Sequence, residues 1–403
     1  MTLFFHILRR FAIICISLLT GVICLVSFFL ESPIDPADYD IKPSLAFTGP
    51  LEVNSILSNA EQILEGYLYG PESLTYHLPT QTIFTGTRDG SVMQIFIGNK
   101  QPKIIHIFRY HNIDSSLCNA TVASVQICGR PLGMRISPFD SNLLVIIDAY
   151  LGVFEYQIKE GVIKHLLKTG ALIKDSNEPP IRYLNDFDFT HDGKLVISEP
   201  SFAFDDYNFH YIVLERSPKG RVLLFDHTTS SLQIRINHLV IPNGIQMDAS
   251  RKCVFVAEMG LYRIIKHCMD RHKIGEYDIL IEGLPGFPDN IRLLPSSGLL
   301  AIPIPMPRLI GEETFLSSKW LRDFIAKIMS ITHPVDALPE KEYGLVILIE
   351  SDSGTIVESW HDPTSKTIAS ITQVLEIDND TFYFGNDGLF YIGRLVMNVI
   401  QPE

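Results

Sequence analysis

Side chains that carry oxygen recur at one position of a short repeated motif. Four copies consist of proline, two further residues and an apolar residue before a strand-like segment: Pro71-Glu72-Ser73-Leu74, Pro131-Leu132-Gly133-Met134, Pro242-Asn243-Gly244-Ile245 and Pro288-Asp289-Asn290-Ile291. Leu184-Asn185-Asp186-Phe187 differs only in its first residue, and Thr372-Gln373-Val374-Leu375 is a looser sixth copy. The second residues, called ring positions below, are Glu72, Leu132, Asn185, Asn243, Asp289 and Gln373.

Carboxylate and amide oxygens at four ring positions favour a calcium site. Ca²⁺ takes six to eight hard oxygen ligands in flexible geometry, and Asp186 and Asn290 lie beside the ring positions. Zinc is not expected, because no ring position is a histidine or cysteine. The alternative is that Asn and Asp at strand starts satisfy turns. Their recurrence at one register position favours the metal.

The spacing of the motif indicates the elements that would position these oxygens. Copies recur roughly every 45–60 residues, a period typical of propellers or repeat arrays. Between them lie short β-rich segments separated by turn signals such as Asp89-Gly90 and Asp192-Gly193. We expect an all-β, six-bladed β-propeller over residues 65–403, because ring closure protects the edges of so many short strands. Each motif would begin the innermost strand of a blade, which places the ring positions at one end of the channel.

Helical periodicity is concentrated in one segment, residues 314–331. Its apolar residues recur at helical spacing and are Leu316, Trp320, Leu321, Phe324, Ile325 and Ile328. We expect a helical insertion in the fifth blade. It has three interpretations: a packed insertion, a lid over one propeller face, or an interfacial helix that touches a membrane.

The N-terminus has the pattern of a signal anchor. Phe11 to Leu30 contains no charged residue and is long enough to cross a bilayer as a helix. Arg9 and Arg10 precede it and acidic residues follow it, which predicts a cytoplasmic tail at 1–10 and a single-pass type II topology. Residues 31–64 would form a stalk, and the propeller would be lumenal or extracellular, in the endoplasmic reticulum, elsewhere in the secretory pathway or at the plasma membrane. A cleaved signal peptide is the alternative.

Cysteines and sequons fit that oxidising compartment. Outside the apolar run the chain has Cys118, Cys128, Cys253 and Cys268, which allow three pairings. Cys118 with Cys128 closes a short loop and is favoured, whereas the pair Cys253–Cys268, flanking a hairpin near Gly260, stays open. Asn119 and Asn379 begin Asn-x-Thr triplets, so both are candidate glycosylation sites. The net charge of −13 argues against a nucleic-acid partner.

Several longer runs resemble the strictosidine synthase-like family, in particular its adipocyte plasma membrane-associated protein branch. This family is related to paraoxonases and gluconolactonases. The matching runs are Gly70-Pro-Glu-Ser73, Cys128-Gly-Arg-Pro-Leu-Gly133, Asp148-Ala-Tyr150, Asn185-Asp186, Pro242-Asn-Gly244, Ala257-Glu258 and Leu284-Pro-Gly-Phe-Pro-Asp-Asn290. The Cys-Gly-Arg-Pro-Leu-Gly and Gly-Phe-Pro-Asp-Asn runs are specific, and the matches cover most of residues 65–395.

The resemblance implies a six-bladed propeller whose metal ligands match Glu72, Asn185, Asn243, Asp289 and Asn290. It also implies that Cys118 pairs with Cys128, and it is consistent with a signal anchor and an insertion in the fifth blade.

Departures from the family pattern limit the expected chemistry. The histidine pair of paraoxonases matches Leu132 and Ala149 here, and the catalytic glutamate of strictosidine synthase matches Gln373, which cannot act as a base. Strictosidine synthesis is therefore not expected, and no Gly-x-Ser-x-Gly sequence supports a serine hydrolase.

The remaining prediction is a Ca²⁺-dependent hydrolase of low efficiency, with weak arylesterase or lactonase activity. Its partners would be a small-molecule ester or lactone and, through the N-terminal helix, the lipid bilayer. The candidate catalytic carboxylates are Glu72 and Asp289. The alternative is a non-catalytic binding protein that calcium stabilises, and a condensing enzyme is the third possibility.

Overall fold

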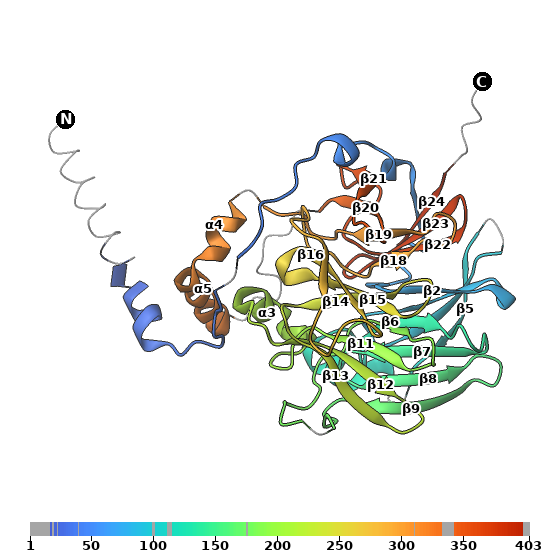
Figure 1. Ribbon diagram of the computed structural model, residues 1–403, viewed down its shortest axis with the longest axis horizontal. Coiled ribbons are helices and arrows are strands. Elements are labelled where there is room, and N and C mark those ends of the chain that lie inside the picture. Colours follow the sequence, from blue (N-terminus) through green and yellow to red (C-terminus); the bar gives the residue numbers. More distant parts are fainter. Residues whose placement is uncertain are drawn as a thin grey trace. The chain divides into compact units, whose positions relative to one another are not determined.

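The fold is seen in a computed structural model (Figure 1) that describes residues 17, 20–21, 23–38, 40–98, 101–110, 115–174, 176–309, 311–332 and 342–397. Within these residues the strands form six antiparallel, four-stranded sheets. The first three sheets are β2 (Leu74–His77), β3 (Thr82–Gly86), β4 (Val92–Phe96) and β5 (Lys103–Phe108); β6 (Pro131–Ile136), β7 (Leu143–Asp148), β8 (Gly152–Gln157) and β9 (Val162–Lys168); and β10 (Phe187–Phe189), β11 (Leu195–Glu199), β12 (Gly220–Asp226) and β13 (Ser231–Leu239).

The other three sheets follow the same order along the chain. They are β14 (Pro242–Met247), β15 (Cys253–Glu258), β16 (Arg263–Cys268) and β17 (Asp278–Ile281); β18 (Arg292–Leu293), β19 (Leu299–Pro303), β20 (Gly344–Glu350) and β21 (Ile356–Asp362); and β22 (Ile371–Asp378), β23 (Thr381–Asn386), β24 (Ile392–Val396) and β1 (Glu61–Ile63).

The first strand of each sheet contacts its counterparts in the neighbouring sheets. These contacts run from β2 to β6, β10, β14, β18 and β22 and return to β2, so the inner strands form a closed ring. The sequence-predicted six-bladed propeller is confirmed. β1 closes the ring by pairing with β24, with Glu61 opposite Arg394. Residues 61–63, at the end of the predicted stalk 31–64, are therefore a strand of the sixth blade.

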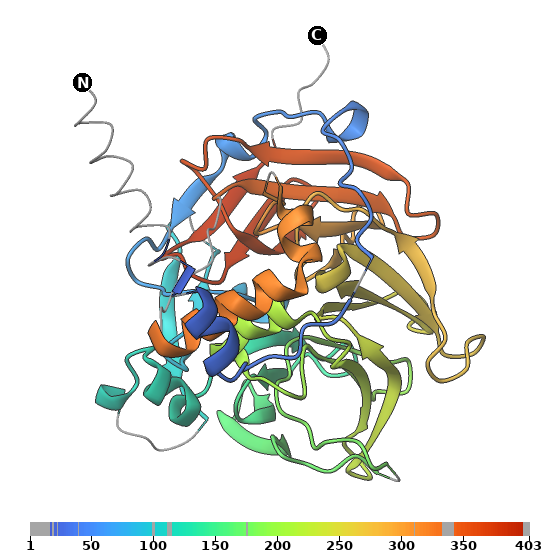
Figure 2. The same ribbon diagram turned by 90° about the vertical axis from the view of Figure 1, so that its left-hand side faces the viewer.

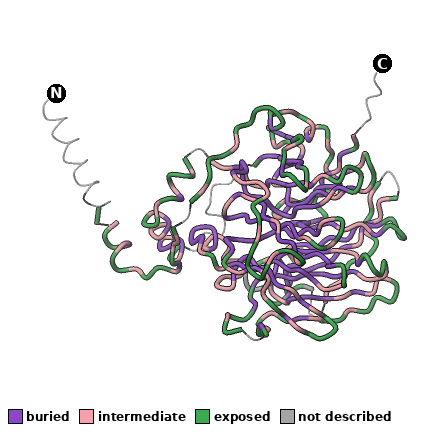
Figure 3. Tube along the Cα trace, in the orientation of Figure 1, coloured by how far each residue is buried: buried purple, intermediate pink, exposed green. Residues whose placement is uncertain are grey.

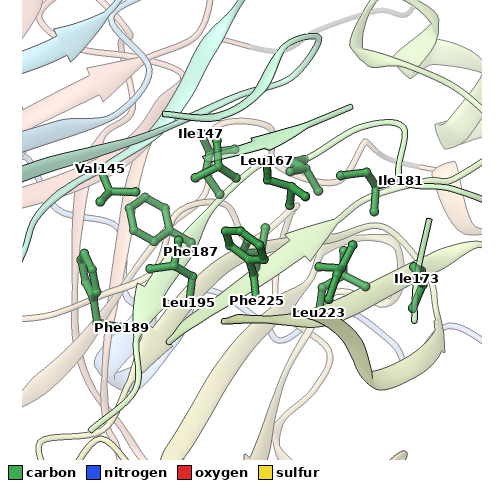
Figure 4. Packing of buried hydrophobic residues seen from close by; sticks show 14 residues of the cluster. Val145, Ile147, Leu167, Ile173, Ile181, Phe187, Phe189, Leu195, Leu223 and Phe225 are labelled. Atoms are coloured by element: carbon green, nitrogen blue, oxygen red, sulfur yellow. The ribbon is translucent and has the colours of Figure 1, made fainter. Parts of the chain in front are cut away.

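The core lies between adjacent blades, and burial decreases from the inner to the outer strands (Figure 3). Every residue of β3 is buried, whereas the outermost strand β5 is largely exposed. Figure 4 shows one such cluster between the second and third blades, where Phe187 and Phe225 are fully buried. Each buried side chain of this size contributes about 1.5–3 kcal/mol, so packing between blades holds the strand starts in register.

Helices interrupt the propeller at a few loops. Among the described residues, the α-helices are residues 23–29, α2 (Val122–Cys128), α3 (Phe209–Glu215), α4 (Glu312–Ser317) and α5 (Lys319–Thr332), and the 3-10 turns are η1 (Gly49–Leu51), η2 (Leu57–Asn59), η3 (Leu78–Thr80), η4 (Ser115–Leu117), η5 (Asp206–Asn208) and η6 (Met259–Leu261). α4 and α5 lie between β19 and β20, which confirms a helical insertion in the fifth blade. It is two helices rather than one, because the backbone is extended at Ser318, whose hydroxyl accepts from Leu321 N at 3.2 Å. α2 and α3 are too short for periodicity to reveal them.

The chain divides into two compact units. Unit 1 comprises Met1–Tyr39, His210–Ser217 and Ile310–Pro339, and unit 2, with the blades, comprises the remaining residues. In unit 1, Figure 2 shows α5 beside the helical residues 23–29. Over the described part of the chain, no helix is both long and apolar enough to cross a bilayer. Residues 11–16, 18, 19 and 22 of the predicted anchor, Phe11 to Leu30, lie outside the described residues.

Candidate metal centre

The six motif copies meet around one end of the ring of inner strands. Ser73 Oγ accepts from Met134 N at 3.3 Å, Gly133 N donates to Asn185 O at 2.9 Å, and Ile245 N donates to Asp186 Oδ2 at 2.8 Å. On the other side, Asn290 N donates to Thr372 O at 3.0 Å, and Thr372 Oγ1 donates to Glu72 O at 2.7 Å. The ring positions are thus neighbours in space although they are spread over the whole chain.

Glycine is required where the fourth and fifth blades meet. A Cβ on Gly244 would lie 2.2 Å from Asp289 O and 2.5 Å from Ile291 N. No side chain fits against backbone at that distance. The glycine after Asn243 therefore lets the strand carrying Asn243 approach the one carrying Asp289.

The five predicted ligands share an unusual property. Each is buried, with at most 6% of its surface exposed, and each has a side-chain oxygen for which the described residues offer no hydrogen-bond partner. The five oxygens are Glu72 Oε2, Asn185 Oδ1, Asn243 Oδ1, Asp289 Oδ1 and Asn290 Oδ1. A buried polar atom without a partner is costly, and five such oxygens at one end of one ring form a donor set that would fit a cation.

Direct contacts connect members of this set. Asn290 Nδ2 donates to Glu72 Oε1 at 2.5 Å, and the Asn243 side chain hydrogen-bonds to the Asp289 carboxylate. Each of these contacts engages one end of a carboxylate or amide and leaves the oxygen named above free. The donor set of two carboxylates and three amides suits a hard cation such as Ca²⁺.

The surroundings of the two carboxylates disfavour their ionised forms. Burial raises the pKa of Glu72 to about 8, against a lowering effect of Arg130. Burial, followed by the neighbouring charge of Glu72, holds the pKa of Asp289 well above its usual range. A divalent cation at this point would neutralise both groups and favour their ionised forms. Across the described part of the chain, no group of three or more His, Cys, Asp or Glu side chains could hold a metal, and three of the five donors described here are amides.

Asp186 lies next to the ring but is already neutralised. Arg292 Nη1 and Nη2 donate to its two oxygens at 2.7 and 3.1 Å, and Arg135 lies 3.8 Å from it. Since both its oxygens have partners, Asp186 is a structural residue of the ring.

The three residues that the resemblance matches to bases of related enzymes, Leu132, Ala149 and Gln373, are all buried. Leu132 and Ala149 are buried apolar residues. Gln373 donates through Nε2 to Leu74 O at 2.5 Å and accepts at Oε1 from Ser73 Oγ at 2.9 Å and Arg292 Nη2 at 2.8 Å. Its amide therefore ties three blades together and offers no base.

A second polar cluster borders the ring, and the sequence analysis missed most of it. Arg88 and Arg130 both donate to the Asp387 carboxylate, and Arg130 Nη1 also donates to Gly70 O at 3.1 Å. Burial acts to raise the pKa of Asp387, but the two guanidinium groups lower it to about 2. Arg130 is therefore a buried partner of an ion pair with Asp387.

Two further groups belong to the same cluster. Tyr183 Oη donates to Asp206 Oδ1 at 3.1 Å, and burial, followed by the charge of Asp387, raises the pKa of Asp206. Arg88, Asp206 and Asp387 follow the second strands of their blades, which are antiparallel to the inner strands and so end where the motifs begin. The alternating direction of the predicted strands could have located these three residues near the motifs.

The predicted Cys118–Cys128 bond is confirmed, and the pair that the sequence left open, Cys253–Cys268, is also bonded, whereas glycosylation at Asn119 and Asn379 stays a prediction. Cys118 is bonded to Cys128, and Cys253 to Cys268, its register partner across β15 and β16. The first bond closes the loop just before Arg130. Asn119 and Asn379 are both exposed and therefore accessible.

The fold and the site define the class of protein: a six-bladed propeller with buried oxygen donors around one end of its ring. Comparison with known sequences identifies the family within this class. Models described as "Strictosidine synthase" and "Strictosidine synthase-like, N-terminal" match residues 185–271 and 49–95. The chain belongs to the strictosidine synthase-like family, in its adipocyte plasma membrane-associated protein branch.

The most informative relatives cover nearly the whole chain. Adipocyte plasma membrane-associated protein of Gallus gallus is 33% identical, over 91% of this chain and 85% of the relative. The Homo sapiens protein is 32% identical, over 92% and 86%. Strictosidine synthase-like protein 13 of Arabidopsis thaliana is 27% identical, over 86% and 91%.

Solved structures share the fold at low identity. A gluconolactonase from Xanthomonas campestris superposes with a TM-score of 0.54 at 14% identity, covering 92% of this chain and 99% of its own. A regucalcin from Agrobacterium tumefaciens, described as a calcium-binding protein, has a TM-score of 0.50 at 12% identity, covering 83% and 93%.

Proposed function

We propose that this chain is a membrane-anchored, calcium-dependent hydrolase of small esters or lactones, with low catalytic efficiency. The observation that carries the proposal is the set of five buried oxygens without hydrogen-bond partners at one end of the ring. The calcium-binding and gluconolactonase descriptions of the structural relatives support the metal and the substrate class. The names of the sequence relatives support a membrane location.

The residues that would hold calcium are Glu72, Asn185, Asn243, Asp289 and Asn290. The chemistry that calcium supplies in such a site is polarisation of a carbonyl and stabilisation of its developing oxyanion. In hydrolysis, water adds to the carbonyl carbon, the bond to the alcohol oxygen breaks, and the proton lost by water ends on the departing alkoxide. Glu72 and Asp289 are the candidate groups to orient that water.

The absence of a dedicated base explains the low efficiency that we propose. Leu132 and Ala149 are apolar, and both ends of the Gln373 amide are engaged. General acid–base catalysis typically contributes 10²–10⁴-fold, so its loss leaves slow turnover. The same observation favours a second candidate function, a non-catalytic binding protein in which calcium stabilises the blades. A condensing enzyme is not favoured, because Gln373 cannot remove a proton from an amine.

Hydrolysis of an aryl acetate and of an aliphatic lactone by the purified full-length chain tests the proposal. We expect EDTA to abolish turnover and calcium to restore it. Glu72→Gln with Asp289→Asn should also abolish it, whereas Glu376→Gln should not. Glu376 is a matched control, since it is a buried carboxylate of the inner strand β22 that binds Ser296 outside the ring of donors.

The outcomes separate the two candidates. Turnover that survives the double substitution would refute the calcium-dependent enzyme. A calcium-dependent rise in thermal stability without turnover above a control protein would favour the binding protein.

A further inference from the structure

Unit 1 contains a helix that is polar where it is buried. α5 spans 14 residues, and its Arg322 is 1% exposed. Arg322 donates to Leu214 O at 2.8 Å, Glu215 O at 2.9 Å and Ala37 O at 2.6 Å. These contacts tie α5 to the end of α3 and to the segment after the N-terminal helix. Ala326 and Met329 complete this buried face.

The opposite face of α5 carries exposed or half-buried apolar side chains around Lys327, which is buried and pairs with Asp323 at 2.9 Å. Trp320 is 53% exposed and Ile331 is 58% exposed. Eleven residues correspond to about three helical turns, so these two side chains lie on one face, and Phe324 stacks on Trp320 with centroids 5.3 Å apart. A helix on a water-covered surface has the reverse pattern, with charged residues outward. The outward face of α5, defined here as Trp320, Phe324 and Ile331, therefore favours an apolar environment.

The helical residues 23–29 give the same signal and contact α5. Phe28 is 81% exposed and Phe29 is 78% exposed, and both lie in the segment Phe11 to Leu30. Lys327, from α5, donates to Ser27 O at 3.1 Å. The end of the anchor segment and α5 are thus parts of one packed unit. The anchor emerges from a bilayer under the proposed function, and this contact places α5 at the bilayer surface.

We infer that α5 is a second membrane-contacting element, whose outward face inserts into the interfacial region of the leaflet from which the anchor emerges. The inference rests on the proposed membrane anchoring. Trp and Phe favour the boundary between headgroups and acyl chains, and an apolar helix face lying in that boundary is stabilised by the area it buries. Among the three interpretations of the insertion, the contact with the anchor segment favours the interfacial helix. The partner is lipid, since the face adjoins residues that lipid would already surround.

The tryptophans of the chain permit a direct test, because there are two of them. The second, Trp360, is 2% exposed and packs on Phe382 inside the blades. The full-length protein would be reconstituted into phosphatidylcholine vesicles whose acyl chains carry bromine near the headgroup. Trp320 emission, measured in Trp360→Phe or as the difference between wild type and Trp320→Phe, should fall about twofold relative to unbrominated vesicles. Emission of Trp320→Phe, from Trp360 alone, should not change.

Equal emission of Trp320 in brominated and plain vesicles would overturn the inference. Emission that depends on the protein-to-lipid ratio, but not on bromine, would also overturn it and would indicate a second copy of the chain on this face. Flotation of the vesicles separates the two proposals. A chain that does not float refutes the anchoring, whereas a chain that floats with Trp320 unquenched refutes only the role of α5.

Discussion

At the scale of residues, the ring contains two kinds of buried aspartate. Asp186 has two arginine-bound oxygens, whereas Asp289 has one oxygen without a partner and a neighbouring carboxylate. In the sequence, Asp289 is the second residue of its motif copy and a predicted ligand, whereas Asp186 is the third residue of its copy and is not. Their partners agree with that difference, since only Asp289 keeps an oxygen without a hydrogen-bond partner.

Matched substitutions should separate these roles. Asp186→Asn leaves the buried Arg292 without its ion pair and should cost about 3–5 kcal/mol of stability, with an unchanged calcium-induced rise in melting temperature. Asp289→Asn removes a buried carboxyl group whose ionised form is disfavoured, so the metal-free protein should be as stable as wild type or more so, while calcium affinity falls at least about tenfold. Thermal denaturation with calcium and with EDTA measures both. Equal effects on affinity would contradict the distinction.

Glu72 should make the metal-free protein sensitive to pH. Its pKa is raised by burial to about 8, so the folded state keeps a proton that the unfolded state releases near pH 4.5. The stabilisation is fully present below the unfolded pKa and is lost as pH rises towards 8. We expect the melting temperature in EDTA to fall between pH 5 and 8 and the stabilisation by calcium to grow over the same range.

The variant Glu72→Gln provides the control for this titration. It should flatten the part of the pH dependence that Glu72 causes, and Glu376→Gln should not. A wild-type melting temperature in EDTA that rises from pH 5 to 8 would contradict the assignment.

At the scale of elements, close contact between inner strands sets the spacing of the donors. Gly244→Ala would force its Cβ against the Asp289 backbone and should lower both stability and calcium affinity. Gly388→Ala is the control, because a Cβ there meets nothing within 4 Å. Calorimetric titration with calcium should show weaker binding for the first variant only. Unchanged affinity in Gly244→Ala would show that the β14–β18 contact does not position the site.

The two disulfides allow a second comparison between elements, because only one of them lies beside the candidate metal centre. Replacing either pair by serine should cost about 2–4 kcal/mol. Only the Cys118/Cys128 variant should also weaken calcium binding, because that loop leads directly into Arg130, whose charge acts on Glu72. Loss of affinity in the Cys253/Cys268 variant to the same extent would contradict this explanation.

At the scale of the whole molecule, the donors come from the first, third, fourth and fifth blades. Calcium would therefore stabilise the closed ring as one unit. At roughly a hundredfold excess over Kd, a ligand that binds only the folded state adds about 2.7 kcal/mol. Chelation should lower the melting temperature of the propeller in one cooperative step, and a scan of intrinsic fluorescence measures it. No shift on chelation would contradict a site shared among blades.

Much of the fold followed from local pattern. Repeated strand starts, turn signals and one amphipathic segment predicted the six blades, the ring positions and the insertion, because alternation and spacing are properties of the chain itself. The predictions that failed concern short segments of the chain. Residues 61–63 were assigned to the stalk, because a three-residue strand is recognisable only from its pairing with β24. The helices α2 and α3 were missed, because each is too short to show a helical period in the sequence.

The sequence by itself determined which atoms are available: the oxygen donors at the ring positions, the cysteines, and the apolar residues of the anchor segment and α5. Tertiary structure alone decided which of them lack partners. Asn290, which the family resemblance implies as a ligand, keeps an oxygen without a partner, whereas both oxygens of Asp186 are bound by Arg292, far along the chain from residue 186. The same holds for Trp320, whose exposure depends on Arg322 fixing the opposite face of its helix. The type of each residue fixes which donor and acceptor atoms it carries. Whether those atoms are buried, and whether they have hydrogen-bond partners, depends on residues far away in the sequence, so only the folded chain decides it.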